Sequence, residues 1–206
     1  MSDLLRPRWR LRRGLAACAG AMGVAWGMAG CGGGSSNPFD NPSQIQNPAI
    51  QGGQKLSFGY FQKCIDPIFL AQLQINNNGV VSTNTCAGSG CHDTVTGTGG
   101  SFRVVPGAQP VDLTNPANTP DVVRQTDMYK NFYSAQGATV FGAPAQSRLF
   151  QKPLLLNILH GGGLVFPNDQ DINARRIAYW ISQPAPQGQD EFSFTPADPS
   201  GTCTPP

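Results

Sequence analysis

Ionisable side chains are scarce in this 206-residue chain, in which 13% of residues are charged and two are histidines. The formal net charge is +2, but five of the basic residues are arginines crowded into residues 1–13. Beyond position 30, nine basic and eleven acidic residues remain, which is a net charge of −2. Because no basic stripe is left, this part of the chain argues against nucleic acid as a partner.

The chain also lacks convincing period-two alternation, internal repeats and a Ser-His-Asp pattern. The first absence predicts few strands, and the last gives no support to nucleophilic hydrolysis. Glycine (25) and proline (18) are frequent instead, so we expect long loops between short helices. From Leu56 onward about 150 residues can build a core, which is enough for one domain.

The first thirty residues carry the pattern of an exported precursor. The basic stretch over residues 1–13 precedes an uncharged run over residues 14–30, as is typical of a secretory signal peptide. The run is short and glycine-rich for a membrane span, which needs about 20 mainly apolar residues. We therefore expect residues 1–30 to be removed.

A lipid-attachment site is predicted at Cys31. Met28-Ala29-Gly30-Cys31 resembles a bacterial lipobox, which implies that Cys31 becomes the lipidated first residue of the mature protein. The absence of Asp at the next position implies an outer-membrane lipoprotein facing the periplasm. The alternative is an ordinary signal peptide cleaved near Gly30. Residues 31–54 are rich in Gly, Asn, Gln, Pro and Ser, which predicts a flexible, lipid-anchored linker.

The most informative motif is Cys86-Ala-Gly-Ser-Gly-Cys91-His92. Two thiols followed by an imidazole are the groups that attach a c-type haem, since the thiols add to its vinyl groups and the imidazole binds its iron. The usual spacing is Cys-x-x-Cys-His, and this chain has two extra residues between the cysteines. We expect Cys86 and Cys91 to hold one covalent haem c, with His92 as an axial ligand.

Few residues are available as the second axial ligand, because after Cys31 the chain contains one other histidine and one methionine. His160 directly precedes three glycines, where the backbone can approach a flat cofactor closely. Met128 lies in a helical stripe, where methionine is more often core filler. His160 is therefore favoured, with Met128 or an open, water-bound position as the alternatives.

Four cysteines remain if Cys18 is removed with the signal peptide and Cys31 carries the lipid, and these four can be used in two ways. Free thiols do not persist in an oxidising compartment. Either haem takes the motif pair while Cys64 bonds to Cys203, or the four cysteines form two disulfides in a haem-free lipoprotein. A zinc site made by the motif and His160 is a weaker alternative, since adjacent Cys and His suit one tetrahedral ion poorly.

Four segments are expected to be helical. They are residues 58–69 with an interruption at Pro67, a helix starting at Thr119 and continuing to Tyr133, residues 147–159 interrupted by Pro153, and a helix capped by Asp169 or Asp171 and ending near Ser182. Three stretches are expected to be loops, namely residues 76–79, 94–100 and 161–163.

The order of these pieces resembles the cytochrome c-like domains of exported bacterial proteins, including the planctomycete type. The matching pieces are Cys64–Phe69, Cys86–Asp93, Ser147–Pro153, His160–Gly163 and the closing helix with Tyr179-Trp180-Ile181. The resemblance spans about residues 56–184. It implies a mainly α, small helical domain with long loops around one covalent haem, over residues 55–185, followed by a tail over residues 186–206.

Electron transfer with redox partner proteins is the activity that the resemblance implies. Two other classes stay open. One is a haem-free, disulfide-bonded lipoprotein that acts as a binding or structural module. The other is a haem enzyme, such as a peroxidase, with an open distal position.

Overall fold

The computed structural model describes residues 54–193, 196 and 203–206, which belong to a compact unit that spans residues 48–206. The predicted signal peptide, the lipidation site at Cys31 and all but the last residue of the predicted linker lie outside the described residues. Within the described segments, no helix is long and apolar enough to cross a membrane.

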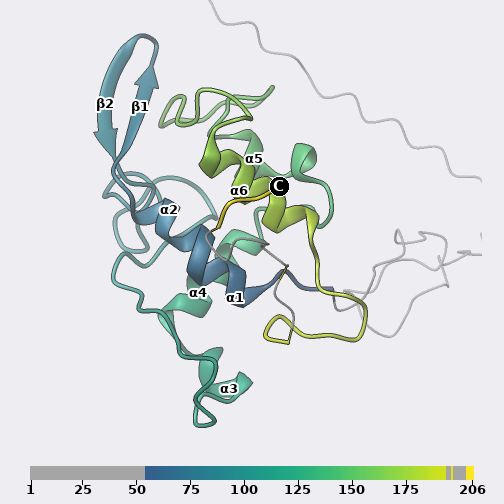
Figure 1. The fold of residues 1–206 in the computed structure, drawn as a ribbon. Helices are drawn as coiled ribbons and strands as arrows, with labels where there is room; N and C mark the ends of the chain where they lie inside the picture. Colours follow the sequence, from purple (N-terminus) through teal and green to yellow (C-terminus); the bar gives the residue numbers. More distant parts are fainter. Residues whose placement is uncertain (1–53, 194–195, 197–202) are drawn as a thin grey trace, which may run out of the picture. The chain divides into compact units, whose positions relative to one another are not determined.

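The fold begins with one helical segment of changing geometry (Figure 1). Its parts are α1 (Phe58–Tyr60), the π-helix η1 (Phe61–Ile65) and α2 (Asp66–Leu70). The side chain of Ser57 accepts a hydrogen bond from the N–H of Tyr60, which caps the segment. Pro67 lies in the first turn of α2, where its missing N–H costs no hydrogen bond. The interruption expected at Pro67 therefore takes the form of a wide turn directly before α2.

A β-hairpin projects from the helices after α2 (Figure 1). Its antiparallel strands are β1 (Leu73–Asn77) and β2 (Val80–Asn84). The turn residues Asn78 (φ 52°) and Gly79 (φ 88°) are both left-handed, as a two-residue type I′ hairpin turn requires. The sequence predicts only a turn here, because the hairpin is largely exposed on both faces and shows no apolar alternation.

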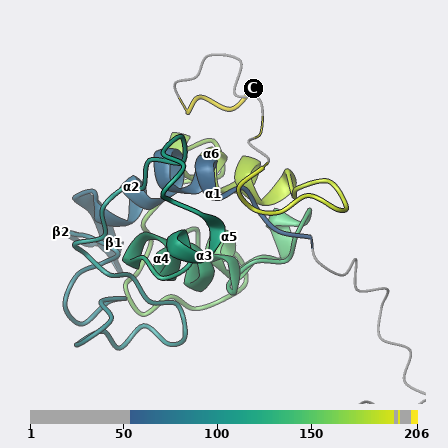
Figure 2. The ribbon, with the colours of Figure 1, turned by 90° about the horizontal axis from the view of Figure 1, so that it is seen from below.

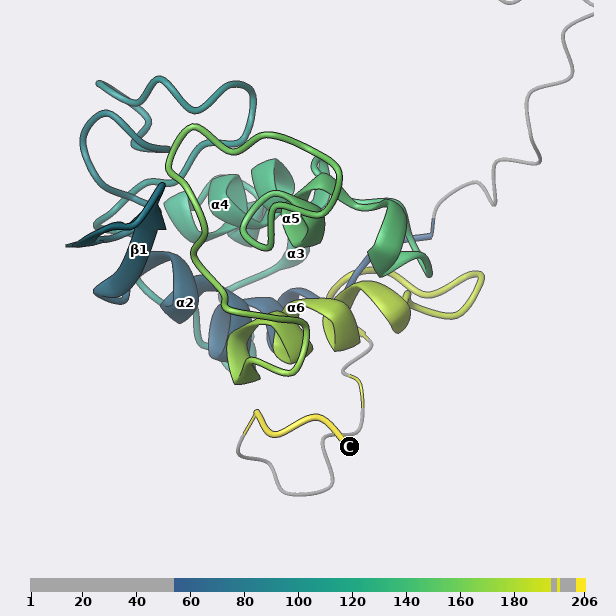
Figure 3. The same ribbon diagram turned by 90° about the horizontal axis from the view of Figure 1, so that it is seen from above.

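The remaining helices surround an aromatic core. They are α3 (Pro120–Val123), α4 (Asp127–Gln136), the 3₁₀-helix η2 (Pro144–Gln146), α5 (Arg148–Gln151) and α6 (Ile172–Ser182). The helix α6 lies beside the first helical segment (Figures 2 and 3). Phe61 contacts Trp180 of α6 with ring centroids 5.3 Å apart, and it contacts Phe132 of α4 at 5.5 Å. These large, buried rings supply much of the apolar area that holds the three elements together.

The chain after α6 returns to the start of the fold. The N–H of Phe58 donates to the carbonyl of Glu191 at 2.8 Å. Glu191 is only 2% exposed, and its carboxylate accepts hydrogen bonds from Tyr129 and Arg124 at 2.8 and 3.1 Å. A disulfide joins Cys64 to Cys203, the pair that cysteine parity leaves when the motif cysteines are set aside.

The predicted mainly α, cytochrome c-like fold is wrong. Helices of all kinds account for only 31% of the described residues, and a two-stranded sheet stands between α2 and the Cys86–His92 motif. The fold is better described as short helices and long loops with one hairpin.

Two of the predicted helices are shorter than expected. The helix predicted from Thr119 splits into α3 and α4, because Thr126 accepts a hydrogen bond from Tyr129 N–H and starts a second helix. Only α5 forms within residues 147–159, since Pro153 cannot donate and the chain beyond it turns through left-handed residues. Asp171, one of the two predicted caps, accepts hydrogen bonds from the first turn of α6.

Candidate cofactor site

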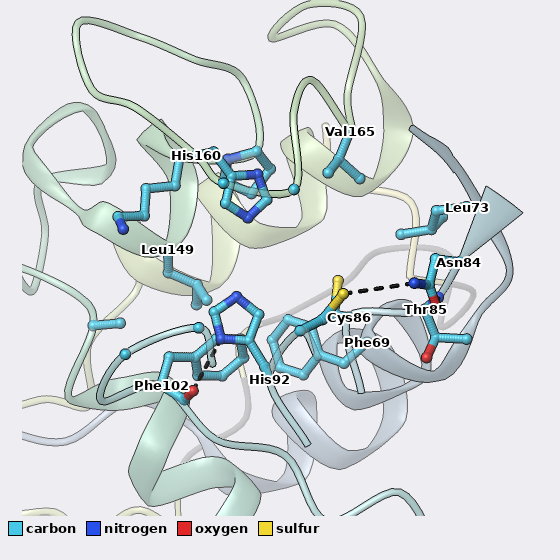
Figure 4. A pocket seen from close by; sticks show the side chains of 18 of the residues that line it. Phe69, Leu73, Asn84, Thr85, Cys86, His92, Phe102, Leu149, His160 and Val165 are labelled. Atoms are coloured by element: carbon cyan, nitrogen blue, oxygen red, sulfur yellow. Dashed lines mark hydrogen bonds between the residues drawn. The ribbon is translucent and has the colours of Figure 1, made fainter. Parts of the chain in front are cut away.

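A cavity of about 550 Å³ opens beside the first helical segment and the base of the hairpin (Figure 4). Its volume lies within the ~300–1,000 Å³ typical of small-molecule and cofactor sites. Aromatic and aliphatic side chains form much of the lining, including Phe69, Leu73, Phe102, Leu149 and Val165. The lining also contains all four predicted site residues, Cys86, Cys91, His92 and His160.

The motif cysteines lie on a compact loop directly after β2. Within it, the N–H of Cys91 donates to Gly88 O at 3.0 Å, and the N–H of His92 donates to Cys86 O at 2.9 Å. These bonds fold the four intervening residues into tight turns, so the second thiol returns to the same cavity as the first. The two extra residues of the motif are therefore absorbed within the loop, and both thiols still line one site.

Both motif cysteines carry free thiols. The only disulfide in the described part of the chain is Cys64–Cys203, and no bond joins Cys86 to Cys91 there. Burial, together with the neighbouring thiol of Cys91, raises the pKa of Cys86 to about 12. Cys91 accepts a hydrogen bond from Asn84, the last residue of β2, with 3.6 Å between nitrogen and sulfur.

The imidazole of His92 is oriented by a hydrogen bond to a backbone carbonyl group. Its Nδ1 lies 3.0 Å from the carbonyl oxygen of Phe102. Because a carbonyl only accepts, Nδ1 carries the proton and Nε2 keeps a free lone pair. Burial lowers the pKa of His92, which favours the neutral form that a metal ligand needs.

The imidazole of His160 has a matching arrangement on the opposite wall. Its Nδ1 lies 2.8 Å from the carbonyl oxygen of Gly163, so Nε2 again keeps the lone pair. The N–H of Gly163 donates back to His160 O at 2.9 Å, which closes a tight turn. Burial lowers the pKa of His160 as well, and the nearby charge of Lys152 adds to this effect.

The two imidazoles face each other across the cavity (Figure 4). Their ring centroids are 6.2 Å apart, and the ring planes differ by only 15°. If two imidazole nitrogens bound one metal ion from opposite sides at about 2.0–2.1 Å, the ring centres would be about 6.3 Å apart. The spacing of His92 and His160 therefore fits a single ion held between their Nε2 atoms.

Other ligand sets that the sequence left open do not gather here. Met128 is 1% exposed and packs in the hydrophobic core, and it does not line the cavity. Among the residues that the structure describes, no three Cys, His, Asp or Glu side chains lie close enough together to hold a metal ion, as a zinc site would need.

The charge of the cavity lining is one-sided. Arg148 and Lys152 both line it, and no Asp or Glu among the described residues does. A basic, largely apolar cavity suits a flat hydrophobic group that carries carboxylates, because the cations can balance the acid groups while the ring system fills the apolar space.

Three contributions to the site have no clear signal in the sequence. Phe102 acts through its backbone carbonyl, which leaves no side-chain signature. Gly99 gives room to His92, since an added Cβ would lie 2.5 Å from Cε1 of that ring. Asn84 donates a hydrogen bond to the thiol of Cys91 from the base of a hairpin that the sequence pattern does not predict.

Comparisons with protein-family models, with curated proteins and with solved structures found no match to this chain.

Proposed function

We propose that this protein binds one covalent haem c and carries electrons. The observation that carries the proposal is the facing pair His92 and His160, with ring centroids 6.2 Å apart, in the cavity that also contains both free motif thiols. Cys86 and Cys91 would hold the group through thioether bonds, and the imidazoles of His92 and His160 would bind its iron.

The residues of this chain define how such a group is held. A bound haem supplies a one-electron couple between ferrous and ferric iron, with a donor protein as reductant and an acceptor protein as oxidant. The backbone carbonyls of Phe102 and Gly163 keep both histidines in the tautomer with a free Nε2. Arg148 and Lys152 offer positive charge to the haem carboxylates. Two imidazole ligands favour a lower potential than a site with methionine.

The proposal extends to where the protein acts. The pattern over residues 1–30 and the lipobox ending at Cys31 support export and lipid attachment at the periplasmic face of the outer membrane. In this location, a lipid-anchored carrier would exchange electrons with redox proteins of the same compartment. Its partners would be proteins that donate or accept one electron.

The test is a haem assay on protein produced together with a cytochrome c assembly system. We expect the pyridine-treated protein to give a c-type haem band, and the haem to stay with the chain after denaturation and acidic extraction. Replacing both Cys86 and Cys91 with alanine should abolish the covalent haem, while a Cys64→Ser/Cys203→Ser control should keep it.

Two results would overturn the proposal. Wild-type protein without a c-type band would favour the haem-free lipoprotein. A haem that is high-spin in the resting protein and reacts rapidly with peroxide would favour the enzyme with an open distal position.

A further inference from the structure

The hairpin contacts both segments that carry the facing imidazoles. On β1, Asn76 exchanges two backbone hydrogen bonds with Leu164, each 2.8 Å long, four residues after His160. At the end of β2, Asn84 donates to the thiol of Cys91, next to His92. One element therefore links the two walls of the cavity.

The turn that carries His160 has few other supports. It lies between α5 and α6, and the neighbouring Leu159 is 91% exposed. On the far side of the turn, the N–H groups of Val165 and Phe166 donate to Pro153 O at 2.8 and 3.1 Å. The bridge to Asn76 is the contact closest to the turn itself.

Gly163 shows how closely the hairpin and the turn approach each other. It is left-handed, with φ at +88°, and its carbonyl accepts the hydrogen bond from His160 Nδ1. An added Cβ would lie 2.6 Å from Asn76 O and 3.1 Å from Asn77 Cα. The residue that orients His160 is therefore pressed against β1, where only glycine fits.

We infer that the hairpin is a positioning element for His160. The bridge between Asn76 and Leu164 holds this imidazole at the spacing from His92 that lets both rings bind one metal ion. The inference rests on the proposed haem function and deepens it. It assigns a role to the inserted hairpin, which places neither a thiol nor an imidazole in the cavity. Asn76 and Gly163 are positioning residues, because they act on the ligand through the backbone.

The hydrogen-bond pattern offers a selective test. In an antiparallel pair the N–H and C=O of one residue point the same way. Those of Asn76 both bond to Leu164, so they are not used in its pairing with Val81 of β2. Asn76→Pro therefore removes a bridge hydrogen bond and spares the ladder of the hairpin. Asn76→Ala is the matched control, because it keeps the backbone bridge and loses only the side-chain contact with Gly79 N–H.

The second pair of variants uses two left-handed glycines. Gly163→Ala strains a left-handed residue and forces a clash with β1. Gly142→Ala is its control, since that glycine is also left-handed, with φ at +74°, a Cβ there meets nothing within 4 Å, and it does not line the cavity. This pair keeps the inference testable if Asn76→Pro does not fold.

The measurement on the holoprotein is the affinity of ferric iron for cyanide, which must displace His160. We expect Asn76→Pro and Gly163→Ala to bind cyanide roughly tenfold more tightly than their controls, which is equivalent to ~1.4 kcal/mol. In the haem-free protein, amide hydrogen exchange at Leu164 should be accelerated by a similar factor in the same two variants.

The outcomes separate this inference from the proposed function. If the wild type is low-spin and both variants match their controls within twofold, the hairpin does not position His160. If the wild type binds no haem, the proposed function fails, and unchanged exchange at Leu164 in both variants would overturn the bridge as a support as well.

Discussion

Gly99 lies against the imidazole of His92, and its N–H donates to the carbonyl of Cys91 at 2.7 Å. An added Cβ would fall 2.5 Å from Cε1 of the ring and 2.7 Å from Cys91 O. The ring is thus confined between this glycine and the carbonyl of Phe102, which accepts its Nδ1–H. The orientation of the His92 imidazole therefore depends on the absence of a side chain at position 99.

Gly99→Ala should tilt the His92 ring and weaken its hydrogen bond to Phe102. We expect a changed electron paramagnetic resonance spectrum of the ferric protein, with a loss of folding stability of about 1–3 kcal/mol from overpacking. Gly107→Ala is the control, because a Cβ there meets nothing within 4 Å. A wild-type spectrum in Gly99→Ala would show that the ring does not need this space.

His160→Ala should convert low-spin ferric haem to high-spin, because it removes the second nitrogen ligand while leaving the covalent attachment intact. The absorbance spectrum of the ferric protein reports this change directly. Met128→Leu is the control, since it removes the thioether from the core at a cost of less than about 1.5 kcal/mol. High-spin iron in Met128→Leu together with low-spin iron in His160→Ala would contradict the assignment of His160.

Asp66 should make the protein less stable as the pH rises above about 4. Burial raises the pKa of its carboxyl above the ordinary value of 3.8, although the hydrogen bond from Asn131 opposes the shift. The unfolded chain therefore releases this proton at a lower pH than the folded chain does. Stability falls across the window between the two pKa values, and the full penalty remains above the folded pKa.

Urea unfolding between pH 3 and pH 7 measures this effect. We expect Asp66→Asn to remove part of the decline, because the amide can still accept from Asn131 and carries no charge to bury. Asp121→Asn is the control, as its carboxylate is 95% exposed. Identical pH profiles for wild type and Asp66→Asn would show that Asp66 is not the group responsible.

Removing the Cys64–Cys203 disulfide should lower the free energy of unfolding by about 2–5 kcal/mol, because the bond closes a long loop in the unfolded chain. The two cysteines are 139 positions apart. Urea denaturation of Cys64→Ser/Cys203→Ser measures the loss, and the single variants control for new free thiols. Unchanged stability in the double variant would mean that the packing of the chain end suffices without the bond.

The residues proposed to hold the cofactor were easier to find in the sequence than the fold was. Cys86, Cys91 and His92 occur in the order that haem attachment needs, and His160 is the only other histidine. Because the sequence contains so few histidines, His160 was the main candidate for a second ligand. All four residues line one cavity in the structure. The carbonyls of Phe102 and Gly163 were not predictable, because backbone acceptors carry no side-chain pattern.

The fold was harder to predict, for physical reasons that differ from element to element. The hairpin has no apolar face, so periodicity could not reveal it, although Asn78-Gly79 is a strong signal for a hairpin turn. The helix predicted from Thr119 is divided in two, because Thr126 caps the start of a second helix. The polar residues around Thr126 gave no sign of this second N-cap in the sequence. The apolar stripe of the closing helix, Ile177, Trp180 and Ile181, was visible because it follows the helical period, and all three residues are buried.

The separation of Cys64 from Cys203 also has a consequence for the unfolded chain when it meets an oxidising compartment. The nearest thiol to Cys64 along the chain is that of Cys86, only 22 positions away, whereas Cys203 is 139 positions away. Closing this shorter loop costs about 1.6 kcal/mol less chain entropy than closing the native one. The thiols assigned to the cofactor are therefore the first competitors for Cys64, and the native bond has to wait until the end of the chain reaches the first helical segment.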